Sequence, residues 1–227
     1  MSTLIQTIKH IVRSFADFTA HSVGIHLHTY QLEPARAVLD SIIYNLGLEI
    51  VIVMPRQAGK DELLLNLIVY LLLLFSHREK DLVIINPTYK PQTVKMLDRL
   101  ENRLKSNLIT RTLWRKRSDF MRKIGLATAS FLSGDKKANV VGGTGSLGVI
   151  CNEAQDIIPA VFDHKFSAMA ASTDATRIYT GTMWTSLTLL HRQIQVAKQA
   201  QEKDGIRRLF FTLPTTSANT TRPMAAL

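Results

Sequence analysis

The sequence predicts an α/β protein with a central, mainly parallel β-sheet that is covered by helices on both faces. Two observations indicate this fold: short apolar runs recur along the chain, and longer stretches with helical spacing separate them. Parallel strands buried on both faces are almost continuously apolar and need helical crossovers between them. The 227 residues, of which 46% are hydrophobic, are sufficient for one domain of this kind.

The first part of the chain is expected to be helical. Apolar side chains recur at helical spacing over residues 3–18, and a second helix is predicted over residues 34–45. Residues 1–28 are therefore interpreted as an N-terminal helical extension and residues 29–213 as the main domain. Residues 214–227 are rich in Thr, Ser, Ala and Pro without apolar periodicity, which predicts a flexible tail or linker.

Strands and helices are predicted to alternate in the main domain. The strands are the apolar runs at residues 48–54, 82–86, 126–132, 147–152, 177–180 and 208–213. The helices are the intervening stretches at residues 59–76, 94–108, 159–171 and 187–202. The most apolar segment, residues 63–75, is shorter than the ~20 residues that a membrane-spanning helix needs, so a buried core helix is expected.

Charge and cysteine content restrict the functional classes. The formal net charge of +10 and the isoelectric point near 9.9 favour a polyanionic partner such as nucleic acid. The single cysteine, Cys151, excludes a disulfide framework, and the N-terminal residues lack the apolar core of a signal peptide. We therefore expect a protein of a reducing cytoplasm that is neither secreted nor inserted in a membrane.

The first motif lies where the strand at residues 48–54 gives way to a helix. Phosphate-binding loops with the pattern Gly-x-x-x-x-Gly-Lys-Ser/Thr occupy such a position, and Gly59 and Lys60 match the end of that pattern. The amides and dipole of a helix start attract anions, and the lysine adds a positive charge. We therefore predict a nucleotide-phosphate site formed by Pro55, Arg56, Gln57, Ala58, Gly59, Lys60 and Asp61.

Two residues depart from that pattern. Met54 replaces the first glycine, and Asp61 replaces the hydroxyl residue. Asp61 either ligates Mg²⁺, for which carboxylate oxygens are suitable, or only complements the dipole of the helix start. The alternative for the whole segment is an ordinary turn between a strand and a helix, with an exposed lysine.

A second motif follows the strand at residues 147–152. In phosphoryl-transfer enzymes, acidic residues at the end of an apolar strand hold Mg²⁺ and polarise the attacking water. Glu153 occupies the water-activating position, whereas Asn152 stands where an aspartate would ligate the metal. A neutral amide is a poorer ligand, so hydrolysis is expected to be weak unless Asp61 compensates for Asn152. The alternative for Glu153 is a solvated helix start.

A third segment, Thr180, Gly181 and Thr182, ends the strand at residues 177–180 with small polar residues. Such a segment at the carboxyl edge of a parallel sheet is well placed to contact the γ-phosphate of a nucleotide.

These segments together resemble the ATPase domain of phage large terminase subunits, the motors that package DNA into capsids. Arg56-Gln57 before Gly59-Lys60 is similar to the variant Walker A motif of that family. Tyr30-Gln31 resembles its adenine-recognition motif. The resemblance extends over residues 29–213, and its specificity comes from the order of the motifs rather than from any one of them.

The later motifs follow the same order. Residues 86–92 resemble the segment that follows the second strand in this family. Asn152-Glu-Ala-Gln155 is similar to its Asp-Glu-Ala Walker B motif, and Thr180-Gly-Thr182 is similar to its coupling motif. The resemblance therefore implies a P-loop NTPase of the RecA-like class that carries a catalytic glutamate.

The resemblance also implies roles for individual residues. Lys60 would bind phosphate, Glu153 would activate water, Gln31 would contact adenine, and Arg56 would stabilise the transferring phosphoryl group in cis. The cofactors implied are ATP and Mg²⁺, with Asp61, Asn152 and Glu153 around the metal. For Gln31 and Arg56 the alternatives are a surface polar residue and a loop residue paired with a carboxylate.

Partners follow from the resemblance as well: double-stranded DNA, the portal, the small terminase subunit and further copies in a ring, in the cytoplasm of a bacterial host. Full-length large terminases also carry a C-terminal nuclease domain with clustered acids. No Asp or Glu follows Leu213, so nuclease activity is not expected there, and we interpret the chain as an excised ATPase domain or a truncated gene product.

The densest positive cluster comprises Arg115, Lys116, Arg117, Arg122 and Lys123. These side chains either follow DNA phosphates without reading the sequence, or form a solvated basic loop. A further alternative is that Arg117 or Arg122 reaches the nucleotide of a neighbouring subunit.

The sequence therefore predicts an ATPase that drives double-stranded DNA into a capsid. One alternative is a helicase-like DNA translocase. Another is a degenerate nucleotide-binding or DNA-binding module in which Asn152 prevents hydrolysis.

Overall fold

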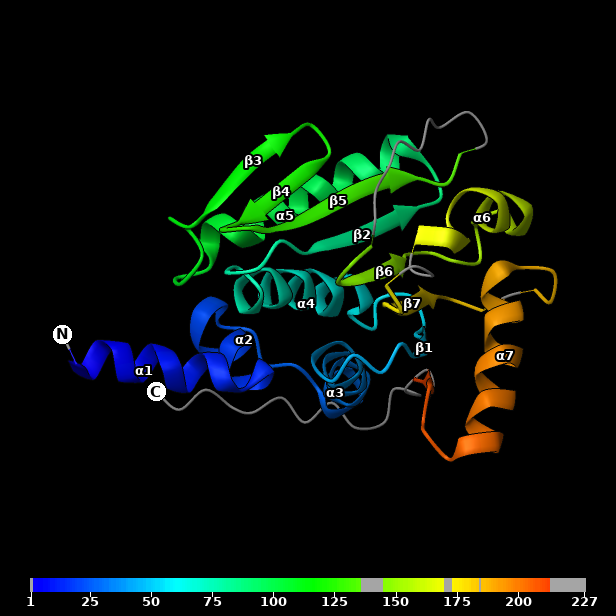
Figure 1. Ribbon diagram of the computed structural model, residues 1–227, viewed down its shortest axis with the longest axis horizontal. Coiled ribbons are helices and arrows are strands. Elements are labelled where there is room, and N and C mark those ends of the chain that lie inside the picture. The colour runs from blue at the N-terminus through cyan, green and yellow to red at the C-terminus, as the bar shows by residue number, and fades with distance from the viewer. Residues whose placement is uncertain (1, 136–144, 170–172, 184, 213–227) are drawn as a thin grey trace.

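The computed structural model describes residues 2–135, 145–169, 173–183 and 185–212, with the side chains of residues 2–5 excepted. It contains one sheet of eight strands in the order β3-β4-β5-β2-β6-β7-β1-β8 (Figure 1). The strands are β1 Glu49–Val53, β2 Asp81–Asn86, β3 Trp114–Ser118, β4 Met121–Ile124, β5 Ala127–Ser133, β6 Gly148–Cys151, β7 Thr176–Gly181 and β8 Leu209–Phe211.

The sheet is mainly parallel, as the sequence predicts. Every pairing from β5 across to β8 is parallel, whereas β4 is antiparallel to both of its neighbours. Strand β1, which precedes the predicted phosphate loop, is separated from β6 by β7. Strand β7 therefore lies between the strands that carry the predicted phosphate loop and the predicted Walker B motif. This order, together with the helices on both faces, confirms the predicted α/β fold with a central, mainly parallel sheet.

Helices pack on both faces of the sheet and form two hydrophobic cores. One core lies under α2 Phe15–Val23, α3 Thr29–Ile43, α4 Lys60–Leu74 and α5 Val94–Ser106. The other lies under α6 Pro159–Lys165 and α7 Leu189–Asp204 (Figure 1). Alternate residues of each central strand point into opposite cores, which explains why these strands are apolar on both faces.

The N-terminal helices differ from the prediction of one helix over residues 3–18. The chain forms α1 Ser2–Arg13 and then α2, because Ser14 is extended and its hydroxyl caps α2 by accepting from the Asp17 N–H at 3.2 Å. Phe15 and Phe18 of α2 are buried and lie against the ring of Tyr70 in α4. The end of the predicted extension is therefore part of the main core.

Helix α3 begins at Thr29, earlier than the predicted start at residue 34. The start is set by Gln31, whose side-chain oxygen accepts from the His28 N–H at 2.9 Å and so satisfies a free amide of the first turn. Pro34 lies inside the helix rather than at its start.

The apolar helix predicted at residues 59–76 is confirmed as α4, which is buried over most of its length. Within the described residues, no helix is both long and apolar enough to cross a membrane. Helices α5, α6 and α7 also match the prediction, although α6 ends at Lys165 and a short 3-10 turn, Ser167–Met169, follows it. The predicted tail at residues 214–227 lies outside the described residues.

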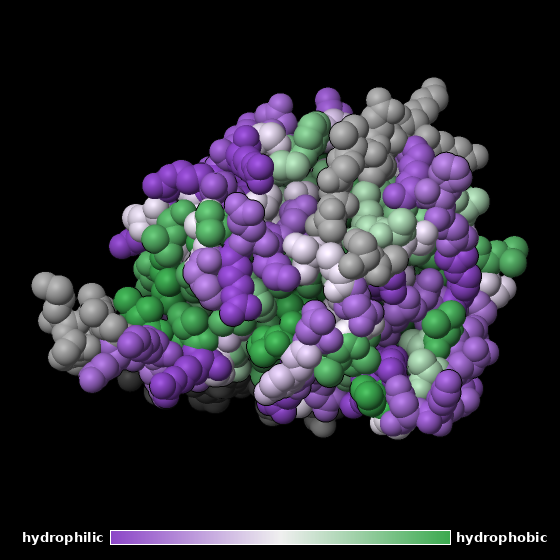
Figure 2. All heavy atoms as spheres, viewed as in Figure 1, coloured by the Kyte–Doolittle hydropathy of each residue, from purple (hydrophilic) through white to green (hydrophobic). Residues whose placement is uncertain are grey.

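The main element that the sequence analysis missed is the hairpin of β3 and β4. The run Trp-Arg-Lys-Arg-Ser has no apolar alternation, so it does not indicate a strand, yet it pairs with β4 at the edge of the sheet. An edge strand with charged side chains resists pairing with other chains, which accounts for the composition. The face seen in Figure 2 is strongly hydrophilic at the upper left, where Figure 1 places this hairpin.

Candidate functional site

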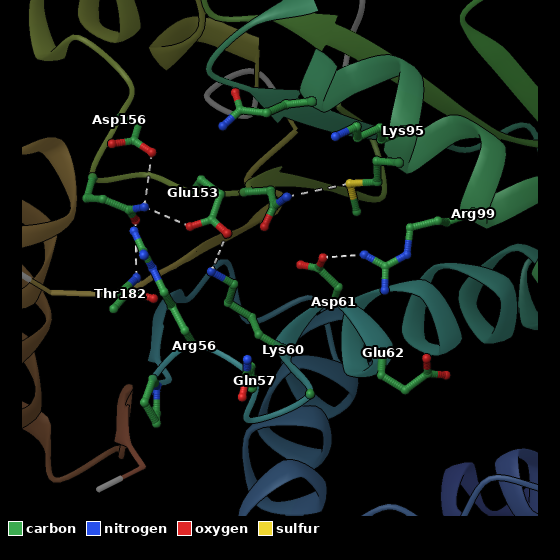
Figure 3. A pocket seen from close by; sticks show the side chains of 16 residues that line it. Arg56, Gln57, Lys60, Asp61, Glu62, Lys95, Arg99, Glu153, Asp156 and Thr182 are labelled. Atoms are coloured by element: carbon green, nitrogen blue, oxygen red, sulfur yellow. Dashed lines mark hydrogen bonds and ion pairs between the residues drawn. The ribbon is translucent and has the colours of Figure 1, made fainter. Parts of the chain in front are cut away.

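A pocket of about 590 Å³ opens at the carboxyl edge of the parallel strands. It is bounded by the loop after β1, the first turn of α4, the adjacent side of α5, the loop after β6 and the end of β7 (Figure 3). Ligands of open α/β sheets bind at this edge because the loops that follow the strands meet there. The predicted phosphate loop, Walker B motif and coupling segment all contribute residues to the pocket lining.

The phosphate loop takes its shape from two residues with left-handed backbone conformations. Gln57 has φ +65° and Gly59 has φ +76°. The φ of Gly59 favours glycine, and a Cβ there would also lie 2.5 Å from Gln31 Nε2, so the Gln31 amide would have to shift. Met54, in place of the first glycine of the pattern, is buried in the core, and its N–H donates to Gly181 O at 3.1 Å.

The structure brings Lys60 and Glu153 together across the pocket. Lys60 Nζ lies 2.7 Å from Glu153 Oε1, and the two side chains are 9% and 27% exposed (Figure 3). Lys60 opens α4, whose free N-terminal amides face the same space. This pair joins the two motifs that the sequence analysis assigned to phosphate and water, although they lie far apart in the chain.

Glu153 is held in a conformation that non-glycine residues rarely adopt. Its φ is +50°, and the backbone around it is fixed on both sides: Asn152 N–H donates to Ile85 O at 2.9 Å and Ala154 N–H to Thr180 O at 2.8 Å. Such strain concentrates at functional sites, where neighbouring contacts impose it. The segment is thus not the solvated helix start considered as the alternative.

Asn152 is nearly buried in a polar network at the base of the pocket. Its Nδ2 donates to Asn86 Oδ1 at 3.0 Å, and its Oδ1 accepts from Thr180 Oγ1 at 3.1 Å. Asn86 Nδ2 has no hydrogen-bond partner among the described residues. The coupling segment is therefore bonded directly to the residue at the metal-side position of the Walker B motif.

Asp61 lines the pocket opposite Glu153. Its carboxylate pairs with Arg99 of α5 at 2.5 Å, and the two side chains are 40% and 50% exposed (Figure 3). The carboxylate also lies in the first turn of α4, where it complements the helix dipole. Both predicted roles for Asp61 are compatible with this position.

Tyr30 and Gln31 lie beneath the phosphate loop and bind its backbone. Tyr30 Oη donates to Ala58 O at 3.2 Å, and Gln31 Nε2 donates to Gly59 O at 3.1 Å. Gln31 is 4% exposed, and its Oε1 accepts from the His28 N–H. The sequence analysis missed this fixing of the loop; the adenine contact of Gln31 remains a prediction.

Several pocket residues were not singled out from the sequence: Glu62, Gln92, Lys95, Met96, Arg99, Gln155 and Asp156. The spacing of Lys95 and Arg99 places them one turn apart on α5, a signal that helical periodicity could have supplied. Burial and the charge of Glu153 raise the pKa of Asp156, while Gln155, Lys60 and Arg56 lower it. Arg56 itself is exposed in the pocket lining.

The basic cluster lies on the β3–β4 hairpin and does not line this pocket. Arg115, Lys116 and Arg117 are exposed. Arg122 is a correction to the predicted surface cluster: it is 4% exposed and pairs with Glu101 of α5 at 2.7 Å. From its position in β4 the guanidinium is directed toward α5, so it is not part of the exposed basic surface.

Sequence comparison gives no match to a protein-family model or to a curated protein. Structural comparison does find similar proteins. The large terminase of bacteriophage HK97 matches with a TM-score of 0.67 at 14% identity, over 93% of this chain and 46% of that one. The large terminase of a thermophilic bacteriophage matches with a TM-score of 0.61 at 15% identity, over 82% of this chain and 45% of that one.

A second structure of the thermophilic-phage large terminase, in complex with ADP, matches with a TM-score of 0.53 at 14% identity, over 68% of this chain and 39% of that one. The chain thus spans less than half the length of these proteins. The resemblance predicted from the ordered motifs is therefore confirmed at the level of the fold: over most of its length, this chain has a fold similar to one part of these phage large terminases.

Proposed function

We propose that this chain binds MgATP in the pocket and hydrolyses it to drive double-stranded DNA translocation in a phage packaging motor. The observation that carries the proposal is the 2.7 Å contact between Lys60 Nζ and Glu153 Oε1. This contact brings together the two side chains to which we assign phosphate binding and general-base catalysis, and so supports the proposal. The ADP complex of the structurally similar thermophilic-phage terminase supports the nucleotide assignment.

Phosphate binding would rearrange this contact. The γ-phosphate carries more negative charge than a carboxylate, so Lys60 would turn to the phosphate together with the amides that open α4. Glu153 Oε1 would then be free to accept the proton of the attacking water. Arg56, in the pocket lining, is placed to approach the transferring group.

The donor set fits Mg²⁺, which prefers oxygen ligands. Asp61 offers a carboxylate and Asn152 an amide in the same pocket lining, which also contains the carboxylate of Glu153. Bound there, the metal would neutralise charge on the β- and γ-phosphates. Asn152 Oδ1 already accepts from Thr180, so Asp61 would be the stronger ligand.

The DNA partner is proposed on charge. The net charge is +10, and Arg115, Lys116 and Arg117 are exposed on the edge strand β3. Lysine and arginine on such a surface bind phosphates without reading sequence, and this binding weakens steeply with salt. The portal, the small terminase subunit and a ring of further copies in the bacterial cytoplasm are proposed on the resemblance to large terminases.

The test is an MgATP hydrolysis assay with and without double-stranded DNA. We expect turnover in the wild type, stimulation by DNA, and a loss of about 100-fold or more in Glu153→Ala. The matched control is Glu202→Ala, which removes an exposed carboxylate from α7 and should not change the rate. Equal rates in wild type and Glu153→Ala would contradict the assignment.

A second function is favoured by Asn152. If the amide prevents productive metal binding, the chain is a nucleotide-binding module without turnover. Tight MgATP binding without hydrolysis in the same assay, with DNA present, would support that module and reject the motor.

A further inference from the structure

Gln155 lies between the Walker B motif and the coupling segment, and its side chain joins them. It is 9% exposed. Its Nε2 lies 2.7 Å from Glu153 Oε2 and 3.2 Å from Asp156 Oδ2, and its Oε1 accepts from the Thr182 backbone N–H at 3.2 Å. One amide group therefore contacts two carboxylates and the end of β7.

The orientation of this amide follows from the chemistry of its neighbours. Ionised carboxylates only accept hydrogen bonds, and a backbone N–H only donates. Turning the amide around would set its oxygen against Glu153 and Asp156, and its NH₂ group against the Thr182 N–H. Gln155 must therefore point its donors at the carboxylates and its acceptor at β7.

Gly181 provides the space that this arrangement needs. A Cβ at position 181 would lie 2.1 Å from Gln155 Oε1 and 2.8 Å from Leu190 Cδ2. A methyl group at this position would require the Gln155 amide to shift, and the hydrogen bonds that the amide makes to Glu153 and Thr182 would shift with it. The glycine of the Thr-Gly-Thr segment is thus complementary to Gln155.

Both ends of Gln155 connect to the phosphate loop. Through Glu153, it reaches Lys60, which lies 2.7 Å from the other carboxylate oxygen. Through Thr182, it reaches the end of β1, because Thr182 Oγ1 donates to Met54 O at 3.0 Å. The contacts form a closed path around the base of the pocket.

Resting on the hydrolytic function proposed above, we propose that Gln155 is a positioning residue that orients the Glu153 carboxylate for water activation and links it to the end of β7. When Lys60 turns to the γ-phosphate, Glu153 loses its contact on Oε1. The Gln155 amide then keeps Oε2 in place, so Oε1 stays directed into the pocket. Thr182 moves with Gln155, which connects the state of Glu153 to the coupling segment.

The charges around the two carboxylates give the link a measurable signature. Burial and the charge of Glu153 raise the pKa of Asp156, and the hydrogen bond from Gln155 opposes this rise, as do Lys60 of α4 and Arg56 of the loop. Lys95 and Arg99 face the same pocket from α5. Removing the donor at Gln155 leaves the cations in place, so a further rise in the pKa of Asp156 would report on the amide alone.

The first experiment measures that signature without turnover. The side-chain carboxyl of Asp156 is titrated by ¹³C NMR in wild type, Gln155→Met and the exposed-residue control Gln199→Met. We expect a higher midpoint for Asp156 in Gln155→Met, because the donated hydrogen bond is lost, and an unchanged midpoint in the control. An unchanged Asp156 midpoint in Gln155→Met would overturn the proposal.

The second experiment measures hydrolysis. We expect Gln155→Met to lower kcat by about 100-fold with KM changed less than about twofold, because the base is misplaced while the phosphate contacts remain. Gln155→Glu keeps the side-chain shape and the oxygen that faces Thr182 but loses the donor, so it should show the same loss in kcat. If Gln155→Met does not fold, the kcat of Gln155→Glu tests the positioning role in its place.

Gly181→Ala tests the link from the opposite side. The added methyl should displace the Gln155 amide and reproduce the higher Asp156 midpoint with the native glutamine present. A wild-type protein that binds MgATP but does not hydrolyse it would reject the proposed function, and the titration would still decide on Gln155. A kcat of Gln155→Met equal to that of Gln199→Met would reject the positioning role alone.

Discussion

The two sides of the pocket are built differently. On the side of β6 and β7, Asn152 and Gln155 are 7% and 9% exposed, and their amides are hydrogen-bonded to neighbouring strands or loops. On the side of α4 and α5, the Asp61–Arg99 pair is 40% and 50% exposed. Buried networks fix geometry because each unpaired group is costly, whereas exposed ion pairs contribute little. The difference predicts that catalytic geometry depends on the β6–β7 side and is tolerant of change on the α4–α5 side.

The largest effect is expected for Lys60→Ala, which removes the contact between the two sides. Nucleotide affinity should fall by about 100-fold or more, because the nearly buried cation that we propose to bind phosphate is lost. Binding of a fluorescent ADP analogue measures this, with Lys198→Ala on the exposed face of α7 as control. Affinity equal to that of the wild type would show that Lys60 serves the ion pair with Glu153 and not the ligand.

Gly59→Ala should lower the free energy of unfolding by about 1–3 kcal/mol, since it adds both a strained φ and a contact with Gln31 Nε2 at 2.5 Å. Gly24→Ala is the matched control, because Gly24 has φ +70° but nothing within 4 Å of its Cβ position. Urea unfolding of the two variants separates backbone strain from the clash. Equal losses would mean that Gln31 moves aside and does not fix the loop.

Asn152→Asp, on the β6–β7 side, is expected to raise MgATP turnover by about tenfold, which corresponds to ~1.4 kcal/mol of barrier. The carboxylate would accept from Thr180 Oγ1 and from Asn86 Nδ2, which has no partner in the described part of the chain, once the Asn86 amide turns around. Steady-state rates against Mg²⁺ concentration provide the measurement. The control Asn102→Asp adds the same charge at an exposed position of α5. An equal gain in turnover in this control would reject a local effect at Asn152.

Asp61→Ser tests function on the α4–α5 side. If Asp61 compensates for Asn152, this variant should weaken nucleotide binding in the presence of Mg²⁺ by about tenfold, with little change in the absence of the metal. Binding measured with and without Mg²⁺ gives the comparison. No change under either condition would reject the compensation hypothesis and leave the helix-dipole role.

The smallest effect is expected for Arg99→Ala, whose free energy of unfolding should change by less than ~0.5 kcal/mol. The exposed pair of Arg192 and Asp163 outside the pocket provides a reference through Arg192→Ala. A loss several times larger than that reference would contradict the contrast between the two sides.

Local patterns in the sequence are sufficient to predict many of the elements. Continuous apolar runs indicate β1, β2 and β6, and the run from Leu63 onward indicates the buried helix α4, because burial on all sides leaves no polar face in the sequence. The order of motifs places Lys60 and Glu153 in one site, since strands of a parallel sheet end at the same edge.

Contacts between distant segments depend on the tertiary structure. The sequence could not show that Gln31 binds the loop carbonyl, that Arg122 is buried against Glu101, or that Gln155 joins Glu153 to Thr182. Nor could it show the β3–β4 hairpin, because an edge strand is defined by its neighbour rather than by its own apolar pattern. The spacing of polar residues in the sequence does not show which residues they will hydrogen-bond to. Those partners are decided only when the folded sheet brings the strand ends together.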